Sequence, residues 1–233
     1  MKASDICQRP AMQRAMQWTM GLFVAFGVLC AQAQPVPGSG CQVDAKPTPA
    51  SPPTILVMGD SLSAAYGLEA SQGWVSLLAS KLAKEHPRWR VVNASISGET
   101  TAGGSARIVS EVLRVRPAVV VIELGANDGL RGLPLREMRR NLARMIGASR
   151  YVGARVLLVG MRIPPNYGAE YTHGFEQQYR ELTSLFDVAL LPFLLEPIAT
   201  DRSKFQGDNL HPVASAQPVL RDHVWAALEP LLD

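Results

Sequence analysis

Short apolar runs alternate with stretches of helical periodicity from Thr54 onward, and this alternation most constrains how the chain folds. The strongest run lies within Ala118–Leu124, where four β-branched residues follow one another from Val119 to Ile122. A strand that is apolar on both faces is typical of a parallel sheet buried beneath helices on both sides. Shorter runs predict further strands at Thr54–Met58, Arg90–Ala94, Val156–Val159 and Val188–Leu191.

The stretches around these strands carry apolar residues at helical spacing or end at prolines. They predict helices over Trp74–His86, Thr101–Arg116, Pro134–Tyr151, Glu170–Phe186 and Ala214–Leu232, the last interrupted near Pro218. Strands that alternate with helices form a parallel sheet with right-handed crossovers, covered on both faces. The sequence therefore predicts a three-layer α/β domain over residues 54–233, with a five-stranded parallel sheet and a ligand site at the carboxyl ends of its strands.

Residues 1–33 have the pattern of a secretory signal peptide. A basic segment precedes the apolar run Trp18–Leu29, and Ala31-Gln32-Ala33 places small residues at a cleavage site, so we expect cleavage before Gln34. The apolar run has about 12 residues, fewer than the ~20 of a membrane-spanning helix, which disfavours an uncleaved anchor. A lipoprotein modified at Cys30 is disfavoured because the preceding residue is the bulky Leu29. We expect a periplasmic or secreted protein with no stable membrane span.

Removal of this leader leaves a nearly neutral chain with a single cysteine. The formal net charge is +3, and the leader holds Lys2, Arg9 and Arg14 but one acidic residue. A nearly neutral chain without a basic run argues against nucleic acid as a partner. Of three cysteines only Cys41 remains, within a Pro/Gly/Ser-rich stretch over residues 34–53 that is typical of a flexible linker. A disulfide scaffold is therefore excluded.

Two groups of polar residues fit nucleophilic catalysis. Ser61 comes directly after the first predicted strand, in Gly59-Asp60-Ser61-Leu62-Ser63, and Asp208 and His211 stand three residues apart near the C-terminus. A serine hydroxyl is a poor nucleophile until a base takes its proton, and histidine can do this when a carboxylate orients its ring. Taken alone, Ser61 and Asp208 also fit helix caps, and His211 fits a solvated loop residue.

Acyl transfer also needs hydrogen-bond donors for the developing oxyanion. Gly98 follows the second strand and offers a backbone N–H with no side chain in the way, and Asn127 follows the third strand and offers an amide. Each of them alone also fits a turn. Because the polar residues follow separate strands of a parallel sheet, we expect them to meet at one edge of it.

The same blocks resemble those of the SGNH (GDSL) hydrolases. Four blocks stand in the family's order: Gly59-Asp60-Ser61-Leu62-Ser63, Gly98, Gly125-x-Asn127-Asp128 and Asp208-x-x-His211. Three stretches are similar to the bacterial periplasmic thioesterase I, lysophospholipase L1 and arylesterase subgroup: Val91–Gly104, Glu123–Pro134 and Met161–Gly168. The resemblance covers nearly all of residues 54–233 and implies a flavodoxin-like three-layer sandwich and an ester hydrolase that needs no metal or organic cofactor.

The resemblance also implies a role for each residue of the site. It makes Ser61 the nucleophile, His211 the base and Asp208 the acid, with the oxyanion hole formed by the backbone N–H groups of Ser61 and Gly98 and the amide of Asn127. The chain departs from the subgroup at Ala65, where glycine is frequent, and at Asn209-Leu210, where Gly-Ile is frequent. Neither departure removes a catalytic group.

The segment Met161–Gly174 follows the fourth strand and, by the same resemblance, flanks the acyl pocket. We expect Ile163, Pro164 and Tyr167 to line that pocket; the alternative is plain packing of a proline-stiffened loop. His173 lies in the same segment and is a weaker candidate base than His211. Some titratable residues are assigned structural or peripheral positions: Asp60, Asp128, His86 and His223.

We predict a monomeric serine esterase that acts through an acyl-enzyme on a small-molecule or lipid ester, such as an aryl ester, an acyl thioester or a lysophospholipid. One alternative in the same fold is a carbohydrate-ester deacetylase. Two others are a non-catalytic binding module and a flavodoxin-like flavin binder. The complete catalytic set argues against the binding module.

Overall fold

The computed structural model describes residues 52–232. The predicted signal peptide, most of the predicted linker and Cys41 lie outside this range. Within residues 52–232, no helix combines the length and the apolar character that crossing a membrane requires.

Five parallel strands form one sheet in the order β2-β1-β3-β4-β5. The strands are β1 Thr54–Gly59, β2 Arg90–Asn93, β3 Val119–Glu123, β4 Arg155–Val159 and β5 Ala189–Leu191. This strand order is that of flavodoxin-like doubly wound sheets. The predicted five-stranded parallel sheet is confirmed.

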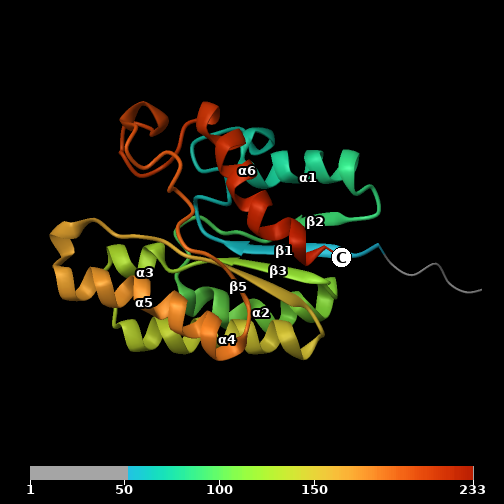
Figure 1. The fold of residues 1–233 in the computed structure, drawn as a ribbon, viewed down its shortest axis with the longest axis horizontal. Helices are drawn as coiled ribbons and strands as arrows, with labels where there is room; N and C mark the ends of the chain where they lie inside the picture. Colours follow the sequence, from blue (N-terminus) through green and yellow to red (C-terminus); the bar gives the residue numbers. More distant parts are fainter. Residues whose placement is uncertain (1–51, 233) are drawn as a thin grey trace, which may run out of the picture. The chain divides into compact units, whose positions relative to one another are not determined.

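Helices cover both faces of the sheet, as the predicted three layers require (Figure 1). Helices α1 and α6 pack together on one face, and α2, α4 and α5 lie on the other. Their bounds are α1 Trp74–Glu85, α2 Thr101–Val115, α3 Ala126–Leu130, α4 Leu135–Tyr151, α5 Ala169–Phe186 and α6 Gln217–Leu228.

The core lies where these layers meet the two central strands. The side chains of Ile55 to Met58 in β1 and of Val119 to Ile122 in β3 have no exposed surface. Burial of each such side chain contributes about 1.5–3 kcal/mol, which explains why both runs are apolar on both faces.

Three features of the helices differ from the sequence prediction. Helix α3 was not predicted, because five residues are too few to show a period. Helix α5 begins at Ala169, one residue before the predicted start, so His173 lies in this helix and the segment that follows β4 ends before it. The predicted closing helix changes character beside Pro218: a 3₁₀ turn at Ala214–Ala216 is followed by α6, with Pro218 in its first turn, and α6 tightens to a 3₁₀ turn at Glu229–Leu231. Proline is tolerated in a first turn because the N–H it lacks has no partner there.

The carboxyl ends of the strands point to one edge of the sheet, on the left in Figure 1. The turn after β1, the loop after β2, helix α3 and the segments after β4 and β5 gather at this edge. The β1–β3 register pairs Gly59 with Glu123 at the last rung, so the segments that carry Ser61 and Asn127 leave the sheet side by side.

Candidate active site

The turn that carries Ser61 folds back onto the end of β1. The backbone N–H of Ala64 donates to the carbonyl of Asp60, and the N–H of Tyr66 donates to the carbonyl of Ser61. Gly59 permits this close approach, because a Cβ there would lie 2.6 Å from the side chain of Ser63. Ser61 is thus held in a tight turn rather than at the start of a helix.

Ser61, His211 and Asp208 form one hydrogen-bonded chain. The Oγ of Ser61 lies 2.8 Å from Nε2 of His211, and Nδ1 of His211 lies 2.7 Å from Oδ2 of Asp208. Of the four histidines, all of which the structure describes, only His211 contacts the Ser61 hydroxyl. This is the geometry in which a histidine, oriented by a carboxylate, accepts the proton of an attacking hydroxyl.

The loop 206–212 fixes Asp208 and His211 relative to each other. Oδ1 of Asp208 accepts hydrogen bonds from the backbone N–H groups of Leu210 and His211, at 2.9 and 3.0 Å. The hydrogen bond from the His211 backbone is the main cause that lowers the pKa of Asp208 to about 2, assisted by the contact with the His211 ring. Ionised Asp208 favours the tautomer that carries hydrogen on Nδ1 and leaves Nε2 free to accept a proton.

Both departures from the family pattern occupy left-handed backbone. Ala65 has a φ of 59° and Asn209 a φ of 56°. Glycine adopts this conformation without steric cost, which accounts for its frequency there in the subgroup. Asparagine tolerates it well, whereas alanine is strained by roughly 1–2 kcal/mol.

The three predicted oxyanion donors line the same cavity as Ser61 and His211. Within residues 52–232, the backbone N–H groups of Ser61 and Gly98 donate to no protein acceptor. Asn127 lies in α3 and directs its Nδ2 to the Oδ2 of Asp60 and to the carbonyl of Glu99, both at 3.1 Å. The structure therefore brings all five predicted residues of the triad and oxyanion hole together.

The cavity has a volume of about 680 Å³, and most of its wall is apolar. Ile163 and Pro164 line it, as predicted, whereas Tyr167 does not. Tyr167 instead donates its hydroxyl to the carbonyl of Leu130, a residue of the cavity wall. Several further residues of the cavity wall were not predicted from the sequence: Leu130, Met161, Phe193, Leu195, Phe205 and Leu210.

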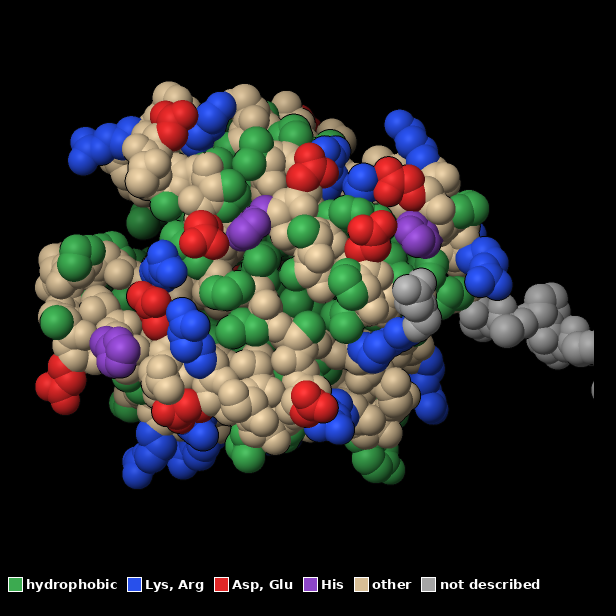
Figure 2. Space-filling model, in the orientation of Figure 1, with side chains coloured by type: hydrophobic (Ala, Val, Ile, Leu, Met, Phe, Trp, Pro, Cys, Tyr) green, Lys and Arg blue, Asp and Glu red, His purple; other side chains and the backbone are tan. Residues whose placement is uncertain are grey.

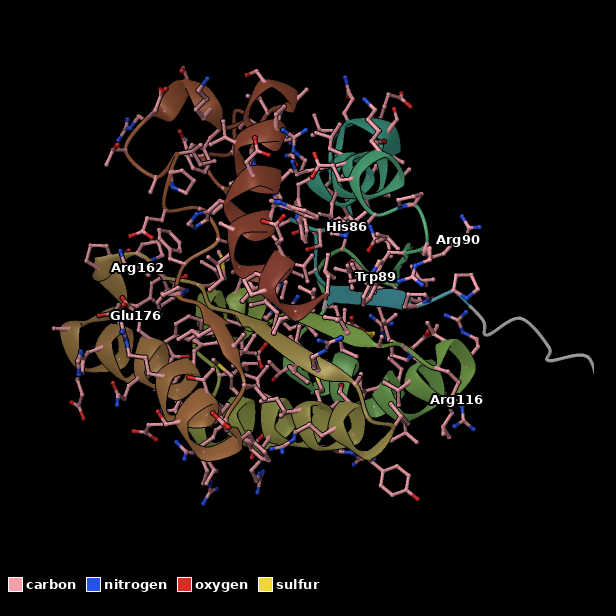
Figure 3. The ribbon with its side chains drawn as sticks, turned by 45° about the vertical axis from the view of Figure 1, so that its right-hand side comes forward. His86, Trp89, Arg90, Arg116, Arg162 and Glu176 are labelled. Atoms are coloured by element: carbon pink, nitrogen blue, oxygen red, sulfur yellow. The ribbon has the colours of Figure 1, made fainter. Side chains whose placement is uncertain are left out.

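Arg162 adds a cation to the cavity wall. Its Nε lies 3.3 Å from a carboxylate oxygen of Glu176, and the two side chains, from the segment after β4 and from α5, point toward one another (Figure 3). Its guanidinium lies 5.0 Å from the ring centroid of Phe193. This ion pair ties the segment after β4 to α5 beside the cavity.

Three buried carboxylates lie near the nucleophile. Asp60 is 1% exposed, and its burial raises its pKa to about 6. Glu123 is fully buried, and burial together with the charge of Asp60 raises its pKa well above the usual range. Asp128 accepts hydrogen bonds from both the N–H and the hydroxyl of Thr101, so it joins α3 to α2, in keeping with its predicted structural role.

Two residues that sequence reasoning missed support the base. The ring of Tyr66 lies 4.5 Å from that of His211, centroid to centroid. Nε2 of Gln206 donates to the carbonyls of Tyr66 and Pro212, at 2.9 and 3.2 Å, so it joins the turn of Ser61 to the loop of His211. Neither contact has a signal in the sequence, because the partners are far apart along the chain.

The other histidines lie elsewhere. His173 is exposed on α5, His86 packs against Trp225, and His223 bonds the carbonyl of Phe193. Within residues 52–232, no three of the side chains that commonly bind metals come together in a metal-binding arrangement. On the face drawn in Figure 2, acidic and basic side chains alternate rather than form a basic surface.

Comparison with known proteins gives consistent matches. Residues 57–217, more than half of the chain, match the GDSL-like Lipase/Acylhydrolase family. Esterase TesA of Pseudomonas aeruginosa is 50% identical over 179 residues, which cover 77% of this chain and 89% of that protein. Thioesterase 1/protease 1/lysophospholipase L1 of Escherichia coli K12 is 39% identical over 180 residues, covering 77% and 85%. The crystal structure of the psychrotrophic esterase EstA from Pseudoalteromonas sp. superposes with a TM-score of 0.74 at 40% identity, covering 77% of this chain and 98% of that one.

Proposed function

The chain belongs to the GDSL-like lipase/acylhydrolase family and is a carboxylic ester hydrolase of the serine type, and we propose that Ser61, His211 and Asp208 are its catalytic triad. The observation that carries this assignment is the hydrogen-bonded chain from the Ser61 hydroxyl to the Asp208 carboxylate. It lies at a cavity that is open to a substrate.

In the proposed acylation step, Nε2 of His211 takes the proton of Ser61 as Oγ attacks the ester or thioester carbonyl. Asp208 accepts a hydrogen bond from the Nδ1–H group and stabilises the imidazolium that forms. The imidazolium then gives its proton to the leaving alcohol or thiol, which departs from the acyl-enzyme. Water, activated by the same histidine, releases the acid and restores the Ser61 hydroxyl.

The charge on the carbonyl oxygen is stabilised by three donors: the N–H groups of Ser61 and Gly98 and the Nδ2 of Asn127. The two backbone donors have no other partner within residues 52–232, so they reach the oxyanion without breaking a protein hydrogen bond. Such donors are already oriented before the reaction, which is why each lowers the barrier by about 2.7–4 kcal/mol.

The proposed substrates are aryl esters, acyl thioesters and lysophospholipids. The apolar wall and the cavity volume of about 680 Å³ support an acyl chain longer than acetyl. A carbohydrate-ester deacetylase would need polar groups around the sugar, and the wall near Ile163 and Phe193 offers few.

We also propose the organisation of the whole chain. Residues 1–33 are a signal peptide, 34–53 a linker and 54–233 the catalytic domain, and the mature protein works as a monomer in the periplasm or outside the cell. The basic segment, apolar run and small-residue cleavage site of the first 33 residues support this address.

The test is hydrolysis of p-nitrophenyl esters from acetyl to dodecanoyl by the purified protein, with Ser61→Ala and Ser97→Ala alongside. Ser97 also lines the cavity but is not part of the proposed triad, so it controls for the loss of a hydroxyl there. We expect activity on medium chains that falls by several orders of magnitude in Ser61→Ala and persists in Ser97→Ala. A folded Ser61→Ala protein with wild-type rates would refute the assignment.

A further inference from the structure

The side-chain amide of Asn127 can help or hinder an oxyanion, depending on how it is turned. Its Nδ2 donates hydrogen bonds, whereas its Oδ1 accepts them and carries a partial negative charge. A rotation by about 180° at the end of the side chain exchanges the two at little steric cost. The proposed oxyanion hole therefore needs a group that keeps Nδ2 turned toward the reacting carbonyl.

In this structure each of the two N–H groups of the Asn127 amide has an acceptor. Nδ2 of Asn127 lies 3.1 Å from Oδ2 of Asp60 and 3.1 Å from the carbonyl oxygen of Glu99. An ionised carboxylate and a backbone carbonyl only accept hydrogen bonds, so Oδ1 of Asn127 would be repelled at either place. Of these two partners, the carboxylate makes the stronger, charge-assisted hydrogen bond.

The Asp60 carboxylate is itself fixed. Its Oδ1 accepts the backbone N–H of Leu62 at 3.0 Å, and its side chain is almost entirely buried. A buried carboxylate with one oxygen tied to the backbone has little freedom, so its second oxygen is a stationary acceptor for the amide. Asp60 thus joins the turn of Ser61 to helix α3, the element that carries Asn127.

On the basis of the proposed oxyanion hole, we propose that Asp60 is a positioning residue. It keeps one N–H of Asn127, so that the other N–H, which the Glu99 carbonyl accepts in this structure, turns to the oxyanion when that charge forms. The site then has two carboxylates with parallel tasks. Asp208 fixes the tautomer of the base, and Asp60 fixes the orientation of the amide donor. The burial that raises the pKa of Asp60 also strengthens this hydrogen bond, because water does not compete for it.

A purely structural role for Asp60 makes a different prediction. In that case the carboxylate would only cap the turn through the N–H of Leu62, and its loss would disturb Ser61 whether or not Asn127 is present. In the proposed role, Asp60 acts through Asn127 alone. A double-mutant cycle separates the two, because residues that act as one unit give losses that do not add.

The experiment measures kcat and KM on a p-nitrophenyl ester for Asp60→Asn, Asn127→Ala and the double variant. Asparagine has nearly the shape of aspartate but adds an N–H₂ group that competes with the Nδ2 of Asn127 for the same place. Loss of a whole oxyanion donor lowers kcat by about 10²–10³. We expect Asp60→Asn to lower kcat by at least tenfold, and by no more than Asn127→Ala does, with KM changed less than threefold. In the Asn127→Ala background the same change should alter kcat less than threefold.

Two further variants keep the test decisive. Asp60→Ser retains an acceptor for the N–H of Leu62 but does not reach Asn127, so it should reproduce the pattern of Asp60→Asn even if that variant folds poorly. Asp128→Asn is the matched control, since it alters another buried aspartate whose partner is Thr101. We expect it to lower the melting temperature with a smaller effect on kcat than Asp60→Asn.

Three results would overturn the proposal: a wild-type kcat in both Asp60 variants, an equal loss of kcat with and without Asn127, or an equal loss in Asp128→Asn. Failure of the proposed function gives a different result, since activity would then survive in Ser61→Ala. If only the role of Asp60 is wrong, activity still depends on Ser61.

Discussion

Replacing Asp60 by asparagine should remove a pH-dependent penalty on folding, and we also expect it to slow the reaction. Burial raises the pKa of Asp60 from 3.8 to about 6, so the folded protein holds its carboxylate at a cost above pH 6. The sign follows from proton binding: between pH 4 and 6 the folded state binds more protons here than the unfolded state, so this group lowers stability as the pH rises. Below pH 4 both states are protonated and the penalty disappears.

The size of the effect follows from the pKa difference of about two units. At about 1.36 kcal/mol per unit, ionised Asp60 destabilises the native state by roughly 3 kcal/mol above pH 6. The neighbours of Asp60 act in both directions: the charge of His211 and the hydrogen bonds from Leu62 and Asn127 lower its pKa, and the charge of Asp128 raises it. Burial is the largest cause, so the net sign is a penalty.

The assay is urea unfolding of the wild type and Asp60→Asn at pH 4, 5, 6, 7 and 8. We expect the difference in unfolding free energy to move in favour of the variant by about 2–3 kcal/mol between pH 4 and pH 7. Lost hydrogen bonds add an offset that does not depend on pH, so the slope, not the absolute difference, tests the reasoning. The same pair is measured in a Glu123→Gln background, because Glu123 also titrates with a raised pKa. A difference that stays constant from pH 4 to pH 8 in both backgrounds would refute the reasoning.

Three other substitutions test the site and its support. Asp208→Asn should lower kcat by about 10³–10⁴ in steady-state assays, since Nδ1 of the base loses its acceptor; a loss below tenfold would contradict the triad. Gln206→Ala removes two hydrogen bonds between the turn and loop that hold the nucleophile and base, so we expect a loss of about 2 kcal/mol in urea unfolding and a lower kcat. Gln178→Ala, which loses one bond within α5 and one from Arg139 of α4, is its control and should leave kcat unchanged; equal kcat losses would rule out a specific link. Gly125→Ala should destabilise the fold by more than about 3 kcal/mol, because φ is 127° and the added Cβ would lie 2.1 Å from a buried tyrosine hydroxyl. Gly147→Ala, in open space on α4, should instead raise the melting temperature, and the opposite order would contradict this steric argument.

The layers of the fold follow from local sequence patterns. The side chains of the run Val119 to Ile122 can all be buried only between two layers of helices. This run forms the fully buried strand β3. Pro218 marks the place where the closing helix changes from a 3₁₀ turn to α6, since a proline is tolerated in the first turn of an α-helix. Helix α3 is too short for a periodic signal, and its start depends on the positive φ of Gly125.

The position of the site residues also follows from a local pattern, the order of strands and polar residues along the chain. Residues that follow the strands of a parallel sheet meet at its carboxyl edge, so Ser61 and Asn127 could be placed there from the sequence. Their support could not, because it depends on which side chains meet across the edge. The reach of Asp60 to Asn127 spans 67 positions of the chain, and that of Gln206 to Tyr66 spans 140. Tyr167 was predicted to line the pocket because it lies in the segment after β4. The 3₁₀ turn Pro165–Tyr167 instead directs its hydroxyl to the carbonyl of Leu130, a contact that the sequence does not indicate.

Several costly features of this protein lie at that one edge, although two other left-handed residues, Arg116 and Asp187, end α2 and α5 elsewhere. Ala65 and Asn209 adopt left-handed backbone there, Asp60 is ionised at a penalty, and Glu123 keeps one buried carboxylate oxygen without a partner among residues 52–232. Strain persists only where the surrounding structure over-determines it, and here the buried parts of strands β1 and β3 lie directly beneath. A carboxylate that destabilises the fold and yet occupies the space beside the proposed oxyanion donor is better explained by its effect on the reaction than by any contribution to folding. When Asp60 is replaced, the rate should therefore fall while the pH-dependent penalty on folding disappears, a combination that a packing role for the residue would not produce.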